Sequence, residues 1–227
     1  MSTAEQSEPK AEPRRPLSRE RVLRGAIELA DERGIESVTM RALAQQLGVE
    51  AMSLYNHVAN KDEILDGMVD TVMEEINDAT SSISGEWKSA MRRRILAARQ
   101  VLLRHPWATG ALVSRTSDSV PLTKYYESLI GLFHAGGFSY DLTHHALHAL
   151  GSRALGFTQE PFDDSQEIPD PAALAQQMAA EYPNTAALLE SVTHDADTTL
   201  GWCDDQFEFE FALDILLDGL ERHRDAG

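Results

Sequence analysis

The stretch Val38–Lys61, VTMRALAQQLGVEAMSLYNHVANK, is the feature that most constrains how this 227-residue chain can fold. It predicts two short helices joined by a tight corner. Thr39 is placed to cap the first helix, and Leu43 and Leu47 give that helix one apolar face. Gly48 follows, where a left-handed residue usually ends a helix. A helix, a short turn containing glycine and a second helix together have the pattern of a helix-turn-helix.

The second helix of this stretch is predicted to continue to Val58, and its apolar positions decide which side faces out. Leu54 and Val58 are one helical turn apart and point into a small core. In a helix-turn-helix the second helix enters the DNA major groove, where hydrogen-bonding and flat side chains suit base edges, thymine methyls and phosphates. The residues left for this outer face and its edges are Ala51, Met52, Ser53, Tyr55, Asn56 and His57.

Two basic residues flank that set. Arg41, one turn into the first helix, is the best candidate for a bidentate contact to guanine, and Lys61 is placed for a phosphate. Together with Thr39 at the start of the first helix, they complete the predicted DNA-binding residues. The alternative is a helical corner without a DNA role, because Leu/Ala/Gly helix pairs are common.

The residues before this stretch predict one more helix and an arm. Ser18 caps a long helix with a buried apolar stripe, and Gly34 ends it, which makes a three-helix domain over residues 17–62. Residues 1–16 are polar, contain proline and lack periodicity, so we expect a disordered arm. Arg14 and Arg15 in that arm are either solvated or reach a minor groove.

The sequence LAQQLGVEAMSLYNHVANKDEILDGM, with LSRERVLRGAIELADERGIESVTMR before it, resembles the N-terminal domain of the tetracycline-repressor (TetR) family of bacterial transcription regulators. The resemblance covers about Leu17–Met68. It implies that a double-stranded DNA operator is the partner of this domain. A weaker likeness to the C-terminal domain of the tetracycline repressor itself continues downstream.

The net charge of −17 is unevenly distributed. Residues 1–61 contain equal numbers of basic and acidic side chains, so the whole excess of negative charge lies downstream. We therefore expect the acidic body to point away from the duplex. Weak non-specific affinity would leave discrimination to a dimer that reads two half-sites.

Residues 63–227 predict a larger domain that is entirely helical, so the fold class is all-α. Asn60 and Glu63 begin a helix that links the two domains, in a variant of the capping box. No segment alternates as a strand would. Further helices are expected at about 87–104, 107–113, 121–135, 140–157 and 204–223, with less regular ones near 172–181 and 184–194 and an acidic loop at 162–171.

Two of these helices, 142–157 and 207–220, are too apolar to bury only one face. The resemblance implies that they form a four-helix bundle across a two-fold axis, which makes the chain a homodimer. Burial inside a monomer is the alternative.

The resemblance also implies a cavity for a small-molecule effector. Trp107 and Tyr126 are candidate aromatic walls. Two arginines in the aligned set indicate an acidic or carbonyl-bearing ligand, although one belongs to the run Arg92–Arg94 and solvation is its alternative. The positions that the alignment directs toward the cavity are Arg94, Ala98, Leu112, Arg115, His144, Leu147, His148 and Ser152.

No metal or cofactor is expected. His144 and His148 are spaced to share a metal, but no third ligand is apparent. The alignment places Ser152 and Leu112 where the tetracycline repressor has metal-ligating histidines, and only Glu160 matches. A magnesium–tetracycline chelate is therefore not the expected ligand. The single cysteine, Cys203, excludes an internal disulfide.

Enzymatic and membrane roles find no support in the sequence. Serine, histidine and acidic residues occur outside any nucleophile-elbow, zincin or phosphate-loop setting. Without a long apolar run or a signal peptide, we expect a cytoplasmic protein with no membrane partner. The sequence favours a ligand-responsive homodimeric repressor, and an activator or a DNA-binding regulator without an effector remains the alternative.

Overall fold

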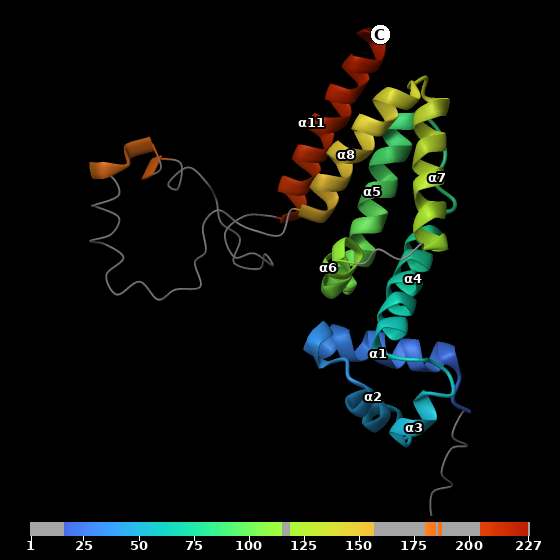
Figure 1. The fold of residues 1–227 in the computed structure, drawn as a ribbon. Coiled ribbons are helices and arrows are strands. Elements are labelled where there is room, and N and C mark those ends of the chain that lie inside the picture. Colours follow the sequence, from blue (N-terminus) through green and yellow to red (C-terminus); the bar gives the residue numbers. More distant parts are fainter. Residues whose placement is uncertain (1–15, 115–118, 157–179, 185, 188–204, 227) are drawn as a thin grey trace, which may run out of the picture. The chain divides into compact units, whose positions relative to one another are not determined.

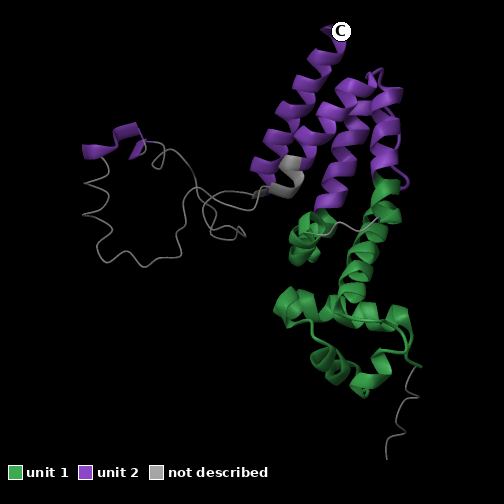
Figure 2. Ribbon diagram, viewed as in Figure 1, with its two compact units in different colours: residues 1–79, 100–125 green, residues 80–99, 126–227 purple. Residues whose placement is uncertain are grey.

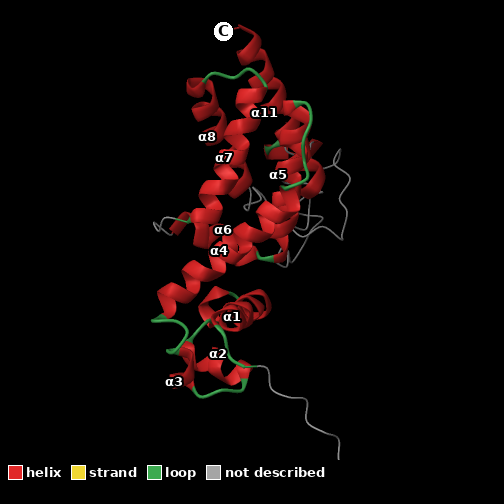
Figure 3. Cartoon of the chain, turned by 90° about the vertical axis from the view of Figure 1, so that its right-hand side faces the viewer, coloured by secondary structure: helices red, strands yellow, loops and turns green. Residues whose placement is uncertain are grey.

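The computed structural model describes residues 16–114, 119–156, 180–184, 186–187 and 205–226, except the side chains of 152–156 and 205. Within these ranges every regular element is a helix, so the predicted all-α fold class is confirmed (Figure 3). None of the described helices combines the length and the apolar character needed to cross a bilayer. The elements are α1 (Arg19–Arg33), η1 (Ile35–Ser37), α2 (Met40–Leu47), α3 (Ala51–Leu54), α4 (Lys61–Thr80), α5 (Trp87–Arg104), α6 (Pro106–Ser114), α7 (Val120–Ala135), α8 (Tyr140–Gly156) and α11 (Asp205–Ala226) (Figure 1).

The chain packs into two compact units, coloured separately in Figure 2. Unit 1 comprises residues 1–79 and 100–125, and unit 2 comprises residues 80–99 and 126–227. Unit 1 therefore contains α1 to α3, most of α4, and the segment around α6. The two units are defined by which residues pack together and combine separate stretches of the chain. They do not test the domain boundaries at residues 16 and 62, which stay predictions.

Local hydrogen bonds begin and end the first helices as the sequence predicts. The Ser18 hydroxyl accepts a hydrogen bond from the Arg21 backbone N–H at 3.2 Å. The Thr39 hydroxyl accepts one from the Ala42 N–H at 3.1 Å. Gly48 adopts φ 66° and ψ 39°, and this left-handed conformation ends α2. These bonds satisfy backbone groups that helix ends otherwise leave unpaired.

The second helix of the helix-turn-helix is shorter than predicted. Leu54 and Val58 are buried as expected, but α3 ends at Leu54. Hydrogen-bonded turns follow, in which the N–H groups of His57 and Val58 donate to the Leu54 carbonyl at 2.9 and 3.1 Å. Asn56 and His57 are weak helix formers, so they favour turns over one more helical turn.

The start of α4 carries the predicted variant capping box. The Asn60 side-chain oxygen accepts from the Glu63 N–H at 2.9 Å, and the Glu63 carboxylate accepts from the Ala59 N–H at 2.6 Å. That backbone bond holds the pKa of Glu63 below its ordinary value, because it stabilises the charged form.

An aromatic cluster in the core of unit 2 forms where α5, α7 and the α7–α8 turn meet. The Trp87 ring lies 4.6 Å from the Phe138 ring between centroids, and Phe133 lies 4.9 Å from Phe138. Gly136 permits this packing, because a Cβ built there would lie 2.6 Å from Trp87 Cγ.

Ion pairs connect α5 to α11 in unit 2. Lys88 Nζ lies 2.6 Å from carboxylate oxygens of both Asp218 and Glu221. Arg92 contacts Glu210 at 2.6 Å and Asp214 at 2.7 Å. These bonds raise the pKa of Lys88 and of Arg92 and lower the pKa of Asp218. In the same unit, α11 packs directly against α8 (Figure 1).

Candidate functional site

The surface of α2, α3 and the start of α4 carries the predicted DNA-binding residues, all of them in unit 1. Met52 is 75% exposed and Tyr55 is 46% exposed. Arg41 is exposed and Lys61 half-buried, and within the described part of the chain neither makes a hydrogen bond or an ion pair. A free guanidinium and a free ammonium beside exposed flat and polar side chains can contact phosphates and base edges.

The other members of the predicted set differ in exposure. Asn56 is exposed, whereas Ala51, Ser53 and His57 are half-buried. The Thr39 hydroxyl serves as the cap of α2 and stays exposed. Five of the nine predicted residues are thus exposed, and the DNA contacts themselves stay predictions.

Unit 1 also contains a polar cluster that the sequence did not reveal. Trp107 Nε1, at the start of α6, donates to Asp31 Oδ1 on α1 at 2.7 Å. His105 Nδ1 lies 2.9 and 3.0 Å from the two Asp31 oxygens, and its Nε2 lies 3.4 Å from Glu75 Oε2 on α4. The cluster joins α1, α4 and α6 through side chains that are far apart in sequence, so no local pattern could predict it.

Further hydrogen bonds hold α4 against the segment 100–125. The Ser119 hydroxyl donates to Asp70 Oδ1 at 2.6 Å. Asn77 Nδ2 donates to the Pro121 carbonyl at 2.9 Å. Both bonds therefore join α4 to the start of α7 within unit 1.

The predicted effector residues are distributed over both units. In unit 2, Ala98 is buried, Arg94 and Leu147 are half-buried, and Tyr126, His144 and His148 are exposed. In unit 1, Leu112 is half-buried, and the indole nitrogen of Trp107 is bonded to Asp31. Their roles in ligand binding stay predictions. Arg115, Glu160, Cys203 and the side chain of Ser152 lie outside the described residues, as do the segments 1–15, 162–171 and 172–179 and most of the residues expected to form a helix at 184–194.

The histidine pair on α8 is solvent-facing. The rings of His144 and His148 lie 4.6 Å apart between centroids. Across the described residues, no group of three histidine, cysteine, aspartate or glutamate side chains is arranged to hold a metal. The pair alone offers two of the four ligands that a structural zinc site uses.

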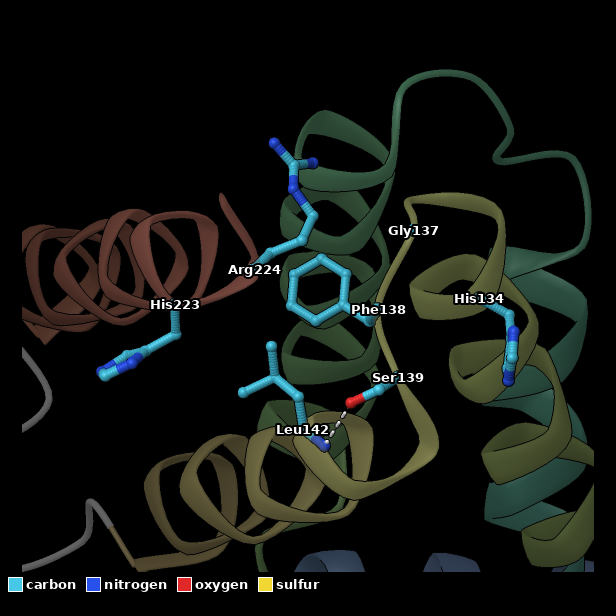
Figure 4. A pocket seen from close by; sticks show the side chains of 7 residues that line it. All are labelled: His134, Gly137, Phe138, Ser139, Leu142, His223 and Arg224. Atoms are coloured by element: carbon cyan, nitrogen blue, oxygen red, sulfur yellow. Dashed lines mark hydrogen bonds between the residues drawn. The ribbon is translucent and has the colours of Figure 1, made fainter. Parts of the chain in front are cut away.

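A surface cavity of about 550 Å³ lies at the α7–α8 turn of unit 2. In Figure 4 its two histidines, His134 and His223, lie on opposite sides of Phe138, and Arg224 is directed away from both. Arg224 is bonded to the Gly136 carbonyl at 3.3 Å and to Asp225 at 2.7 Å. The polar groups do not converge on one point, and none of the predicted effector residues lines the cavity. Its lining consists of His134, Gly137, Phe138, Ser139, Leu142, His223 and Arg224.

The helix α11 has two apolar sides. One side is buried in unit 2 and includes Phe209, Leu213 and Leu217, each 1% exposed. The other side carries an apolar ridge of Phe207, Phe211 and Ile215, which are 54–63% exposed. On the neighbouring α8 the exposed side carries Tyr140 and histidines. Exposed apolar side chains gathered on one side of a helix are a feature of many interaction surfaces.

Two family models match this chain, and together they span both parts of it. Residues 22–68 match the model described as bacterial regulatory proteins, tetR family. Residues 82–224 match the model of the tetracyclin repressor-like C-terminal domain. The chain belongs to the tetR family.

Other members of the tetR family resemble the chain over most of its length. It is 31% identical over 209 residues to the tetracycline repressor protein class D of Escherichia coli, covering 90% of this chain and 89% of that protein. It is 26% identical over 219 residues to the HTH-type transcriptional repressor DrrR1 of Streptomyces coeruleorubidus, and the match covers 94% of this chain and 80% of that protein. The structure of a possible TetR family transcriptional regulator from Streptomyces coelicolor A3(2) superposes with a TM-score of 0.70 at 26% identity, covering 90% and 99%.

Proposed function

We propose that this tetR-family protein is a homodimeric transcriptional repressor that a small-molecule effector releases from its operator. The observation that carries the proposal is the exposed surface of α2, α3 and the start of α4. There Arg41 and Lys61 have no partner among the described residues, and Tyr55 and Met52 are exposed. Two relatives that match at least 90% of the chain, a tetracycline repressor and a transcriptional repressor, support repression. Its target would be double-stranded DNA in the bacterial cytoplasm, and it would have no enzymatic activity.

Dimerisation is proposed through α8 and α11. The apolar ridge of α11 is exposed in the single chain, and a second copy would remove it from water. A two-fold axis would pair the same ridge from both copies, as an isologous interface requires. Two heads could then read half-sites about 34–36 Å apart, which a single copy cannot do.

The effector response is proposed to run through unit 1. Asp31 ties α1 to α6 through Trp107 and His105, and Asp70 and Asn77 tie α4 to Ser119 and Pro121. An effector that displaces α6 would therefore move the helices that carry the DNA-binding surface. Release follows only if the effector binds more tightly to the state that cannot bind the operator.

A gel-shift assay with DNA from the protein's own promoter region tests the DNA-binding surface. We expect Tyr55→Ala and Lys61→Ala to lose operator binding while size-exclusion chromatography still shows a dimer. Lys124→Ala is the matched control, because Lys124 is exposed on α7 outside this surface. Unchanged operator binding in both surface variants would contradict the assignment.

A further inference from the structure

Three consecutive arginines on α5 have three different environments. Successive residues of a helix are rotated by about 100°, so adjacent side chains leave in different directions. Arg92 is directed to α11, where it contacts Glu210 and Asp214. Arg93 is exposed and donates to the carbonyls of Ser84 and Ser89 at 2.7 and 3.2 Å. The charge of Arg92 is therefore paired with carboxylates of α11, and the guanidinium of Arg93 is bonded to nearby backbone carbonyls.

Arg94 is half-buried and has only neutral acceptors. Its Nη1 donates to the Ser128 hydroxyl on α7 at 3.0 Å, and its Nη2 donates to the Ile83 carbonyl at 3.3 Å. Its Nε is fully buried and reaches no acceptor. Within the described residues no carboxylate lies within 4.0 Å of this guanidinium. A partly buried cation without a carboxylate partner lowers the stability of the folded protein. Such a cost is typical of residues that serve a binding site.

The same unit holds the other buried polar atoms that lack a partner. Among the described residues these are Trp87 Nε1, also on α5, and Thr143 Oγ1 on α8. Buried donors are usually satisfied, so each exception calls for a physical explanation.

We propose that the effector carries an anionic oxygen group, a carboxylate or an ionised phenol, and that Arg94 binds it. This inference rests on the proposed function. The Nε–H and an adjacent Nη–H of arginine form a fork that matches two oxygens of one group. In the present bonds to the Ser128 hydroxyl and the Ile83 carbonyl only the donor is charged. An anionic oxygen in place of either acceptor would add the second charge and form an ion pair. That exchange makes binding of the anion favourable although residues 62–227 carry the chain's whole excess of negative charge.

The first test needs no ligand. The thermal midpoint of full-length Arg94→Met is compared with those of wild type and Arg92→Met. An uncompensated guanidinium that is replaced by an apolar side chain of similar length should leave the midpoint unchanged or raise it. Arg92→Met should lower it, because it leaves Glu210 and Asp214 without their partner. A fall in Arg94→Met as large as that in Arg92→Met would show that Arg94 is a structural residue, and the inference would be wrong.

The second test uses matched probes of different size and charge. Benzoate, 2-naphthoate and anthraquinone-2-carboxylate are each compared with the corresponding carboxamide, and alizarin supplies an acidic hydroxyl. We expect at least one anion to stabilise the wild-type protein and to bind at least about tenfold more tightly than its neutral partner. Arg94→Gln should abolish this preference, and Arg93→Gln should keep it. Preferential binding of a carboxylate probe would indicate a carboxylate in the effector, and preferential binding of alizarin would indicate an ionised phenol.

The outcomes separate this inference from the proposed function. If carboxamides bind as tightly as the acids and Arg94→Gln has no effect, the effector is neutral and only the anion assignment fails. If no probe binds, the thermal comparison decides between a functional and a structural Arg94. Loss of operator binding in Tyr55→Ala is independent of both results and concerns the DNA-binding surface alone.

Discussion

Asp31 receives two donors from a segment that follows it by more than 70 residues. Its carboxylate accepts from Trp107 Nε1 and contacts His105 Nδ1, and both ring systems are buried, with 8% and 7% exposure. A buried donor that loses its acceptor keeps the cost of its lost hydration. One side chain on α1 therefore stabilises the position of the segment that begins α6.

Asp31→Ala should accordingly lower the free energy of unfolding by about 1–3 kcal/mol, because it leaves Trp107 Nε1 and His105 Nδ1 without their shared carboxylate. Urea unfolding followed by tryptophan fluorescence measures the change. Glu32→Ala is the control, since Glu32 is 65% exposed and its carboxylate lies 4.0 Å from Arg33. Equal stability of the two variants would contradict this role of Asp31.

A second residue-scale prediction concerns Gly136. The added Cβ in Gly136→Ala would lie 2.6 Å from Trp87 Cγ, so the ring or the turn must shift. We expect a loss of about 1–3 kcal/mol, as for overpacked cores, and a changed near-ultraviolet circular dichroism signal from Trp87. Gly131→Ala is the matched control, because Gly131 lies in α7 with nothing within 4 Å; it should stabilise the helix by about 0.5–1 kcal/mol.

At the scale of elements, α11 is held to α5 by half-exposed ion pairs as well as by its buried apolar side. The pairs of Lys88 and Arg92 run along one side of α11 from Glu210 to Glu221. Each such pair is worth little by itself, because water screens partly exposed charges. Four carboxylates facing two cations nevertheless favour one register between the two helices.

These ion pairs predict how stability depends on pH. The pKa of Asp218 is lowered by its hydrogen bond to Lys88. The stability that this ion pair adds to the folded protein is therefore fully present above the ordinary aspartate pKa of about 4. The contribution is lost as pH falls through the lowered value. The raised pKa of Lys88 causes no loss until strongly alkaline pH.

We therefore expect the thermal midpoint to fall below about pH 4, and we expect Lys88→Met to flatten that acid dependence. Differential scanning calorimetry between about pH 3 and 7 measures both curves. Glu127→Gln serves as the control because Glu127 is exposed on α7. If Lys88→Met and wild type had parallel curves, the Lys88–Asp218 pair would not be the cause.

At the scale of the whole molecule, the exposed ridge of α11 is the feature that supports the proposed dimer. An apolar ridge beside a buried apolar side means that this helix is apolar on two sides, which a surface helix of a monomer usually avoids. A dimer of the proposed kind also explains how a chain with a strongly negative body can bind DNA specifically. Two heads that bind together gain effective concentration without any new contact.

Phe211→Asp places a charge in the middle of the ridge and should give a monomer in light scattering. Operator affinity should fall by about 10²-fold or more, because the second head no longer binds intramolecularly. Val113→Asp is the control, as Val113 is an apolar residue of α6 that is 69% exposed outside the ridge. If the Phe211→Asp protein remained dimeric, the dimer interface would not be the ridge of α11.

Local features of the fold were accessible from the sequence. Ser18, Thr39 and Asn60 cap helices through atoms three residues away, and Gly48 adopts the conformation its position predicts. The helical periods of α4, α5 and α8 were visible for the same reason. The early end of α3 was not, because weak helix formers before Asn60 can take either a turn or one more helical turn.

By itself, the sequence determined the helical class, the caps and the family resemblance, because each depends on residues within one or two turns of one another, while the DNA-binding set stays a prediction. Only the tertiary structure distinguished Arg92, Arg93 and Arg94, which are chemically identical neighbours. Their environments depend on Glu210, Asp214 and Ser128, which other helices bring to α5. The bond from Trp107 to Asp31 across 76 residues belongs to the same class. Contacts between distant segments are set by how the helices pack, and no local pattern encodes them.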